Sequence, residues 1–123
     1  MWLPAPDPTL ALVTRIVDGM ASDRQILRVD DVVDRCGVEK RALQRLFARY
    51  VGVSPKWVIQ RYRLHEVSAH LAADPSTKQS ALALGLGYAD QAHFVRDFRA
   101  SVGTSPGAYA RRVRRDRRRP GGR

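Results

Sequence analysis

An internal repeat limits the folds open to this chain more than any other feature of its sequence. A shift of 51 residues places the segment Gly-Val-Ser-Pro at 52–55 on the segment Gly-Thr-Ser-Pro at 103–106. The same shift matches four further pairs of similar residues: Arg45 with Arg96, Phe47 with Phe98, Val51 with Val102 and Leu43 with Phe94. A repeat of this kind indicates one supersecondary unit that occurs twice in the chain.

Apolar residues recur at spacings of three and four almost throughout, and no segment alternates over the length of a strand. This periodicity predicts an all-α fold of about seven helices. The apolar stripes span residues 10–20, 29–36, 43–51, 57–71, 82–86, 94–102 and 109–113. We expect Leu10 on the core face of the first helix, and Trp57 on that of a long fourth helix from Pro55 to about Ala73. A capping residue followed by proline is expected to begin the helices at residues 7–8, 54–55 and 105–106.

Each copy of the repeat reads as a short helix, a tight turn, a longer helix and a Gly-x-Ser-Pro step into the next helix. This order is typical of the helix-turn-helix, whose second helix enters the major groove of DNA. The sequence therefore predicts two helix-turn-helix subdomains at 9–53 and 75–113, a linker helix at 54–74 and a basic, disordered tail at 114–123. The repeat alone would also fit a duplicated helical hairpin that binds no ligand.

The charge of the chain is concentrated at one end. Lys and Arg number 22 against 12 Asp and Glu, so the formal net charge is +10. The segment from Arg111 to Arg123 contains eight arginines and one aspartate, which leaves only +3 for the first 110 residues. Excess positive charge favours polyanions as partners, nucleic acid above all. A solvated basic tail on an ordinary domain would give the same total, so the motifs must decide.

The predicted third helix carries an exposed face suited to reading base pairs. Its non-core positions are Lys40, Arg41, Gln44, Arg45 and Arg49, with Ala48 among them. Positions 41, 44, 45 and 48 share one helix face. Arginine can bind guanine O6 and N7 in a bidentate manner, and glutamine can bind adenine N6 and N7. Only one acid, Glu39, lies at this face, which favours base reading over a merely solvated surface.

The corresponding face of the predicted sixth helix is less polar. It carries Gln91, Ala92, Val95, Arg96 and Arg99, with Asp90 as the expected helix cap. Ala92 and Val95 offer methyl groups that can contact thymine methyls, whereas the two arginines can bind a phosphate or a purine. We expect this helix to read fewer bases than the first and mainly to anchor the protein.

Enzyme, metal and membrane functions find no support in the sequence. A single cysteine, Cys36, excludes an internal disulfide and a cysteine-based zinc finger, and its apolar neighbours predict a small buried residue. His65 and His70 point to different faces of the long helix, and His93 has no nearby cysteine or paired carboxylate. No apolar run approaches the roughly 20 residues of a membrane span, and no secretory signal is visible. We therefore expect a cytoplasmic protein with no catalytic residue, metal or cofactor.

Two groups of motifs resemble the DNA-binding domain of the AraC/XylS family. The segments at 42–47 (Ala-Leu-Gln-Arg-Leu-Phe), 52–55 and 63–64 (Arg-Leu) are similar to its first half. The segment at 87–94 (Gly-Tyr-Ala-Asp-Gln-Ala-His-Phe), with Phe98, Gly103 and the Ser-Pro at 105–106, is similar to its second half. The likeness covers about residues 9 to 113 in the family's order and spacing.

This resemblance implies two helix-turn-helix units on a linker helix roughly 27 Å long, contacting successive major-groove segments of double-stranded DNA. It also implies transcription regulation, contact with the transcription machinery, and an N-terminal sensor domain that is missing from this chain. Glu39 stands where the family usually has a capping Ser or Thr, so we expect a weak cap there. The linker-like opening at residues 2–6 favours a fragment of a longer regulator.

Two other interpretations compete with this one. A helical protein-interaction module with an incidental basic tail would scatter basic residues over its body. An RNA-binding protein would need an exposed aromatic platform on which bases stack. The clustering of Arg41, Gln44 and Arg45 on one helix face favours double-stranded DNA over both.

Overall fold

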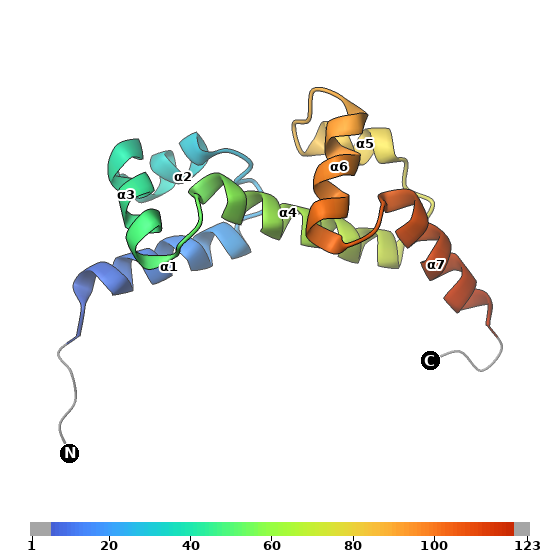
Figure 1. Cartoon of the computed structure of the whole chain (residues 1–123), viewed down its shortest axis with the longest axis horizontal. Coiled ribbons are helices and arrows are strands. Elements are labelled where there is room, and N and C mark those ends of the chain that lie inside the picture. The colour runs from blue at the N-terminus through green and yellow to red at the C-terminus, as the bar shows by residue number, and fades with distance from the viewer. Residues whose placement is uncertain (1–5, 120–123) are drawn as a thin grey trace, which may run out of the picture. The chain divides into compact units, whose positions relative to one another are not determined.

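The computed structural model describes residues 6–119, and within that range every regular element is a helix (Figure 1). The helices are α1 (Pro8–Ser22), α2 (Val29–Cys36), α3 (Lys40–Tyr50), α4 (Pro55–Ala73), α5 (Gln79–Gly85), α6 (Gln91–Val102) and α7 (Pro106–Arg118). The all-α prediction and the expected order of helices are confirmed. Residues 2–5 of the predicted linker-like opening and residues 120–123 of the predicted tail lie outside the described range.

The two Ser-Pro steps of the repeat begin helices in the same way. Ser54 Oγ accepts a hydrogen bond from the backbone N–H of Trp57 at 3.1 Å, and Ser105 Oγ accepts one from the backbone N–H of Ala108 at 3.1 Å. Proline occupies the next position in both copies, where a helix needs no N–H donor. The residue that ends the preceding helix is Gly103 in the second copy, with φ 96° in the left-handed region that glycine adopts without strain.

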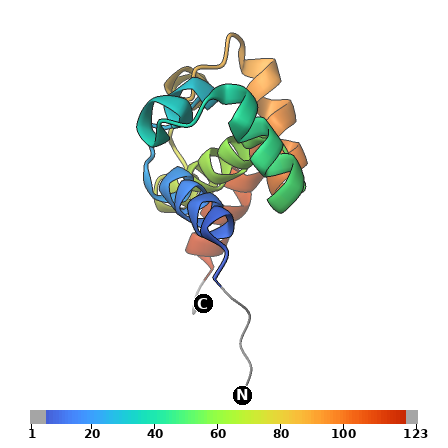
Figure 2. The same ribbon diagram turned by 90° about the vertical axis from the view of Figure 1, so that its left-hand side faces the viewer.

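The chain divides into two compact units, one ending at Gln60 and the other beginning at Arg61, so the boundary falls inside α4. In the first unit α1, α2 and α3 pack on one another and can be followed from blue to green in Figure 2. Its buried apolar residues come from all four of its helices and one loop: Val13, Ile16, Met20, Ile26, Val32, Leu43, Phe47, Val58 and Ile59.

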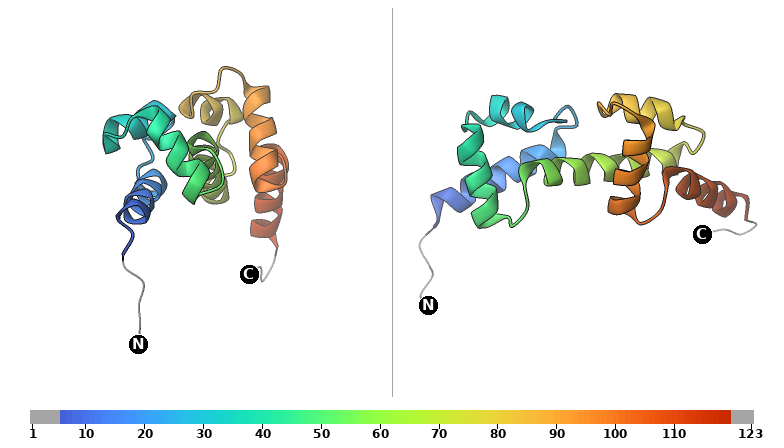
Figure 3. Two further views of the ribbon diagram at one scale, coloured as in Figure 1. Left: turned by 60° about the vertical axis from the view of Figure 1, so that its left-hand side comes forward. Right: turned by 45° about the horizontal axis from the view of Figure 1, so that its top comes forward.

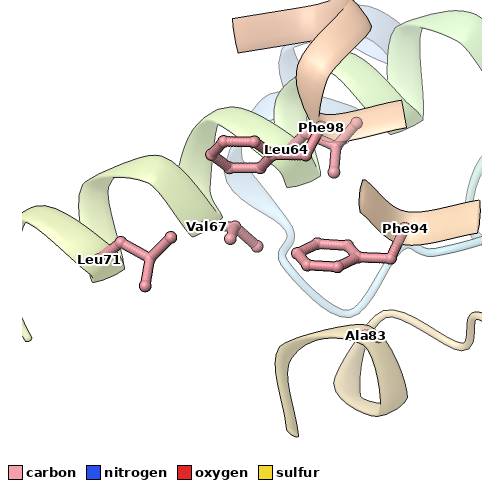
Figure 4. Close-up of a cluster of buried hydrophobic side chains, with 6 residues drawn as sticks. All are labelled: Leu64, Val67, Leu71, Ala83, Phe94 and Phe98. Atoms are coloured by element: carbon pink, nitrogen blue, oxygen red, sulfur yellow. The ribbon is translucent and has the colours of Figure 1, made fainter. Parts of the chain in front are cut away.

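The core of the second unit forms where α4, α5 and α6 meet (Figure 4). Its buried side chains are Leu64, Val67, Leu71, Ala83, Phe94 and Phe98. Phe98 also lies edge-on to Tyr109 of α7, with ring centroids 6.1 Å apart. Since Phe94 and Phe98 are fully buried, truncating either to alanine would cost about 3–5 kcal/mol of stability. This packing holds α6 in place and leaves its opposite face to solvent.

Three predicted core positions are wrong in detail. Trp57 is 48% exposed and Leu10 is 49% exposed, although both fall in apolar stripes. The first turns of α4 bury Val58 and Ile59 instead, because this end of the helix packs in the first unit and its other end packs in the second. One apolar stripe therefore does not describe the whole of α4. Cys36 is only partly buried, since it lines an open hollow between α1 and α2.

The predicted disorder of the basic tail is wrong for residues 114–118, which continue α7 as far as Arg118. Arginine is a good helix former, and two of the arginines also find partners. Arg114 Nη2 donates to the backbone carbonyl of Pro75 at 3.0 Å, and Arg117 Nη2 donates to that of Ala73 at 2.9 Å and to that of Ala72. The last carbonyls of a helix lack partners within it, so Arg117 satisfies groups that α4 leaves open.

Candidate nucleic-acid interface

In the first unit, α2 and α3 are joined by a three-residue turn at 37–39 and run in different directions, as the right view of Figure 3 shows. Gly37 adopts φ 70° at the end of α2, which lets the chain turn at once into α3. Asp31 fixes the start of α2, because its carboxylate accepts hydrogen bonds from the backbone N–H groups of Leu27 at 3.0 Å and Arg28 at 2.9 Å. These bonds lower the pKa of Asp31 below its usual value.

All five residues that the sequence assigned to the reading face of α3 are exposed: Lys40, Arg41, Gln44, Arg45 and Arg49. Leu43 and Phe47 on the opposite face are fully buried and hold the helix against the first unit. The structure therefore brings the predicted residues together on one surface. The expected weak cap is also found, since Glu39 makes no side-chain hydrogen bond at the start of α3.

These five side chains fall into two groups by their surroundings. Lys40 Nζ lies 3.6 Å from Asp30 Oδ1, and the Arg49 guanidinium lies 5.7 Å from the centroid of the Tyr50 ring. The side chains of Arg41, Gln44 and Arg45 make no hydrogen bond or ion pair with any other residue between 6 and 119. Their donors and acceptors are therefore available to a ligand.

A hollow of about 370 Å³ lies beside this face in the first unit. It is lined by residues of the start of α2, of α3, of the turn that follows α3 and of the start of α4: Val29, Gln44, Ala48, Gly52, Val53, Ser54, Pro55 and Lys56. Gln44 thus stands at the rim of a concave, mostly apolar surface. Such a surface is suited to an apolar group about the size of a methyl group.

In the second unit, α5 and α6 repeat the arrangement of α2 and α3 around a longer turn at 86–90 (Figure 3). Asp90 Oδ1 accepts the backbone N–H of His93 at 2.7 Å, which confirms Asp90 as the cap of α6. Ala92, Arg96 and Arg99 are exposed as expected. The other two predicted residues differ from expectation.

Gln91 is exposed, but its Nε2 donates to Gln79 Oε1 of α5 at 3.3 Å, so one of its polar groups already has a partner. Val95 is partly buried against the core cluster and does not stand fully on the outer face. The reason is that α6 packs Phe94 and Phe98 inward, and position 95 lies at the edge of that packing. The outer face of α6 is therefore smaller than the sequence indicated.

Tyr88, His93 and Asp97 make polar contacts that the sequence analysis did not predict. The Tyr88 hydroxyl donates to Asp97 Oδ2 at 2.9 Å, and His93 Nε2 lies 3.5 Å from the same oxygen, so the expectation that His93 has no paired carboxylate is wrong. Burial, helped by the bond to Asp97, raises the pKa of Tyr88, which keeps the hydroxyl protonated as a donor. The spacing of residues 93 and 97 by one helix turn was the signal available in the sequence.

A buried arginine also escaped notice as a structural residue. Arg63 of α4 is 3% exposed, and its Nε lies 3.2 Å from Glu66 Oε1 one turn further along the helix. The arginine at position 63 matched the family motif, but the motif did not show that its side chain is buried. A guanidinium in this position supports the second unit from inside and does not reach its outer face.

No three histidine, cysteine, aspartate or glutamate side chains between residues 6 and 119 are grouped so that they could hold a metal ion. None of the helices described combines the length and the apolar character needed to cross a bilayer.

Comparison with known proteins decides which family the two units represent. The family described as a helix-turn-helix domain matches residues 32–112, a range that includes both turns. A solved structure of a transcriptional regulator with an AraC-type DNA-binding domain, from Chromobacterium violaceum, is 27% identical and covers 93% of this chain and 96% of its own, with a TM-score of 0.61. The chain belongs to the AraC-type helix-turn-helix family.

Two further proteins are similar to this AraC-type domain. The HTH-type transcriptional activator AarP of Providencia stuartii is 30% identical over 93 residues, which cover 76% of this chain and 67% of AarP. The C-terminal domain of AraT, a response regulator from Geobacillus stearothermophilus, is 21% identical, covers 85% of each chain and has a TM-score of 0.63. At that identity the likeness to AraT concerns the fold alone.

Family membership confirms the predicted function. The AraC-type domain is a DNA-binding domain of transcription regulators, and the family is not a class of enzymes. Its members bind double-stranded DNA through helix-turn-helix units, and the described residues of this chain contain two of them, α2 with α3 and α5 with α6. The exposed faces of α3 and α6 are thus the surfaces to consider for binding to DNA.

Proposed function

We propose that the AraC-type domain recognises its DNA site mainly through α3, whose Arg41, Gln44 and Arg45 contact base edges in the major groove. One observation carries this assignment: these side chains are exposed, share one face and leave their hydrogen-bonding groups unoccupied among residues 6–119. A bidentate pair of arginine with guanine, or of glutamine with adenine, needs a side chain in that condition.

Lys40 and Arg49 serve a different purpose in this proposal. Both border the reading face, but Lys40 already pairs with Asp30 and Arg49 lies over Tyr50. Such charges are suited to backbone phosphates, which fix the position of a protein on DNA without distinguishing sequences. Replacing either should weaken binding to all duplexes alike.

The second reading helix, α6, supplies fewer base contacts. Ala92, Arg96 and Arg99 are exposed, whereas Gln91 bonds to Gln79 and Val95 packs partly inward. Ala92 can contact a thymine methyl, and the two arginines can bind phosphate or guanine. In this proposal α6 anchors the domain and adds a weaker sequence preference.

Two partners complete the proposal. The domain acts on the transcription machinery, in line with the description of AarP as a transcriptional activator. It also works as part of a longer protein with a sensor domain, as the description of AraT as a response regulator with a C-terminal domain of this fold suggests by analogy. A regulator of this kind acts where the genome lies, which is the cytoplasm of a bacterial cell.

The triple variant R41A/Q44A/R45A tests the assignment of the reading face. After a preferred duplex has been selected from random sequences, the measured quantity is the ratio of its affinity to that of a scrambled duplex. Removing even one bidentate base pairing should cost about 1–3 kcal/mol of discrimination, so the ratio should fall at least about fivefold.

The single variant Lys40→Ala is the control for this test. It removes one exposed cation from the same helix, so it should weaken both duplexes equally and keep the ratio. A triple variant that retains the full ratio would show that the base-reading residues lie elsewhere.

A further inference from the structure

Six of the arginines between residues 111 and 119 belong to two sets with different surroundings. Arg117 donates hydrogen bonds to backbone carbonyls at the end of α4, and Arg114 donates one to the backbone carbonyl of Pro75. These two residues tie α7 to the second unit. Arg111, Arg115, Arg118 and Arg119, which we term the outer arginines, make no hydrogen bond or ion pair with another residue of the described range.

The outer arginines surround one open hollow of about 390 Å³. Among the described residues only Arg114 lines it besides these four. Its walls therefore consist of arginine side chains from α7 and from the residue that follows the helix. No carboxylate and no apolar residue between 6 and 119 belongs to the lining. All four outer arginines are exposed.

The positive charges around this hollow are not balanced by any acidic side chain among the described residues of its lining. Like charges within a Debye length of about 8 Å repel one another at physiological ionic strength, and no acid in the lining offsets them. Guanidinium groups bind phosphate oxygens in a bidentate manner, which makes them the preferred side chains for phosphate-rich partners. The surface is therefore complementary to a polyanion.

We propose that the outer arginines form a second DNA-binding surface, independent of base sequence, which binds backbone phosphates next to the segment that α6 contacts. This inference rests on the proposed function. Helix α7 packs on α6 in the same unit and follows it after the short step at 103–105, so both helices can meet one duplex (Figure 3). An acidic protein partner fits less well, because protein interfaces depend on aromatic and aliphatic anchors, which this hollow lacks.

The first experiment replaces the outer arginines together, in the variant R111Q/R115Q/R118Q/R119Q. Affinity for the preferred duplex and for a scrambled duplex is measured by fluorescence anisotropy over a range of salt concentrations. We expect both affinities to fall by the same factor. The slope of log affinity against log salt should become shallower by about 0.9 for each phosphate that the variant no longer neutralises. The ratio between the two duplexes should not change.

Two neighbouring residues provide a matched pair of single variants. Arg117→Gln and Arg118→Gln remove the same charge one position apart on α7. We expect Arg118→Gln to reduce the salt slope by about 0.9 and to leave the unfolding temperature unchanged. Arg117→Gln should lower the unfolding temperature and leave the salt slope as it is. Equal effects of the two variants on both quantities would overturn the division into two sets.

The remaining outcomes separate this inference from the proposed function. A quadruple variant with an unchanged salt slope would overturn the phosphate-binding role while leaving base reading by α3 intact. A changed affinity ratio would show that the outer arginines read bases, which also overturns it. If the slope is unchanged and the quadruple variant loses binding to poly-glutamate, the surface serves an acidic protein instead. Wild-type protein without any preferred duplex would contradict the proposed function itself.

Discussion

Asp31 helps to position the exposed face of α3 although it is not part of that face. Its carboxylate holds the backbone N–H groups of Leu27 and Arg28 and so fixes the start of α2, the helix on which α3 is positioned. These bonds favour the charged form, and the pKa of Asp31 in the folded protein is lower than in the unfolded chain. The stabilisation is therefore complete above the unfolded pKa and is lost as the pH falls through the folded one.

This linkage predicts a pH-dependent difference between the wild type and Asp31→Asn. At pH 7 the variant should have the lower free energy of unfolding in urea, and the difference should shrink as the pH falls below about 4, where aspartate protonates. Asp34→Asn is the control, because Asp34 is an exposed aspartate on the same helix whose side chain has no hydrogen bond within residues 6–119. Identical pH profiles for the two variants would show that the Asp31 bonds do not hold α2.

Individual residues also differ between α3 and α6 in how many of their polar groups remain unpaired. On α3 the predicted side chains are exposed, and three of them have no partner in the described range. On α6 the bond from Gln91 to Gln79 and the packing of Val95 occupy part of the corresponding face. Equivalent positions in the repeat therefore offer DNA different numbers of free groups, which is why we place most of the sequence discrimination on α3.

At the scale of the helices, the two copies of the repeat are most alike at the starts of α4 and α7. The serine caps of α4 and α7 have the same geometry, although the helices differ in length and surroundings. The starts of the reading helices differ more, because Asp90 caps α6 through its side chain and Glu39 does not cap α3. Side-chain capping is therefore the same at the starts of α4 and α7 but differs between the starts of α3 and α6.

Removing either serine cap should destabilise the protein to a similar extent. We expect Ser54→Ala and Ser105→Ala each to lower the free energy of unfolding by about 1 kcal/mol, since each leaves a helix N–H group without its partner. Ser80→Ala is the control, because Ser80 lies exposed on α5 and its hydroxyl makes no hydrogen bond among the residues described. Urea unfolding measures all three, and cap variants no less stable than the control would refute the assignment.

On the scale of the whole molecule, one chain contains two helix-turn-helix units whose second helices, α3 and α6, expose different side chains. A helix-turn-helix dimer reads a palindrome because its two units are identical. In this protein α3 carries Arg41, Gln44 and Arg45, whereas α6 exposes Ala92, Arg96 and Arg99. A monomer that uses both helices therefore needs a DNA site without symmetry.

We predict that selection from random duplex DNA yields an asymmetric motif of two short boxes about one helical turn apart, roughly 34 Å from centre to centre. The box with the stronger base preference should be the one that loses its preference in R41A/Q44A/R45A. Titration with a duplex carrying one site should give one protein per duplex. A palindromic motif occupied only by dimers would contradict the prediction.

The sequence by itself determined the helices, their starts at Ser54 and Ser105, the two turns and the exposed face of α3. These features depend on local periodicity, capping chemistry and glycine, all of which act within a few residues along the chain. The motifs at 42–47 and 87–94 then indicated the family, which the comparisons confirmed.

Only the tertiary structure decided which side chains remain available to DNA. Trp57 is exposed because the two ends of α4 pack in different units. Gln91 bonds to Gln79 of α5, which lies twelve residues earlier in the sequence. Arg117 bonds to the end of α4, 45 residues away in the sequence, while Arg118 beside it faces solvent. Such pairings depend on where distant backbone groups meet after folding, so the sequence predicted one uniform basic tail where the folded chain holds two sets of arginines.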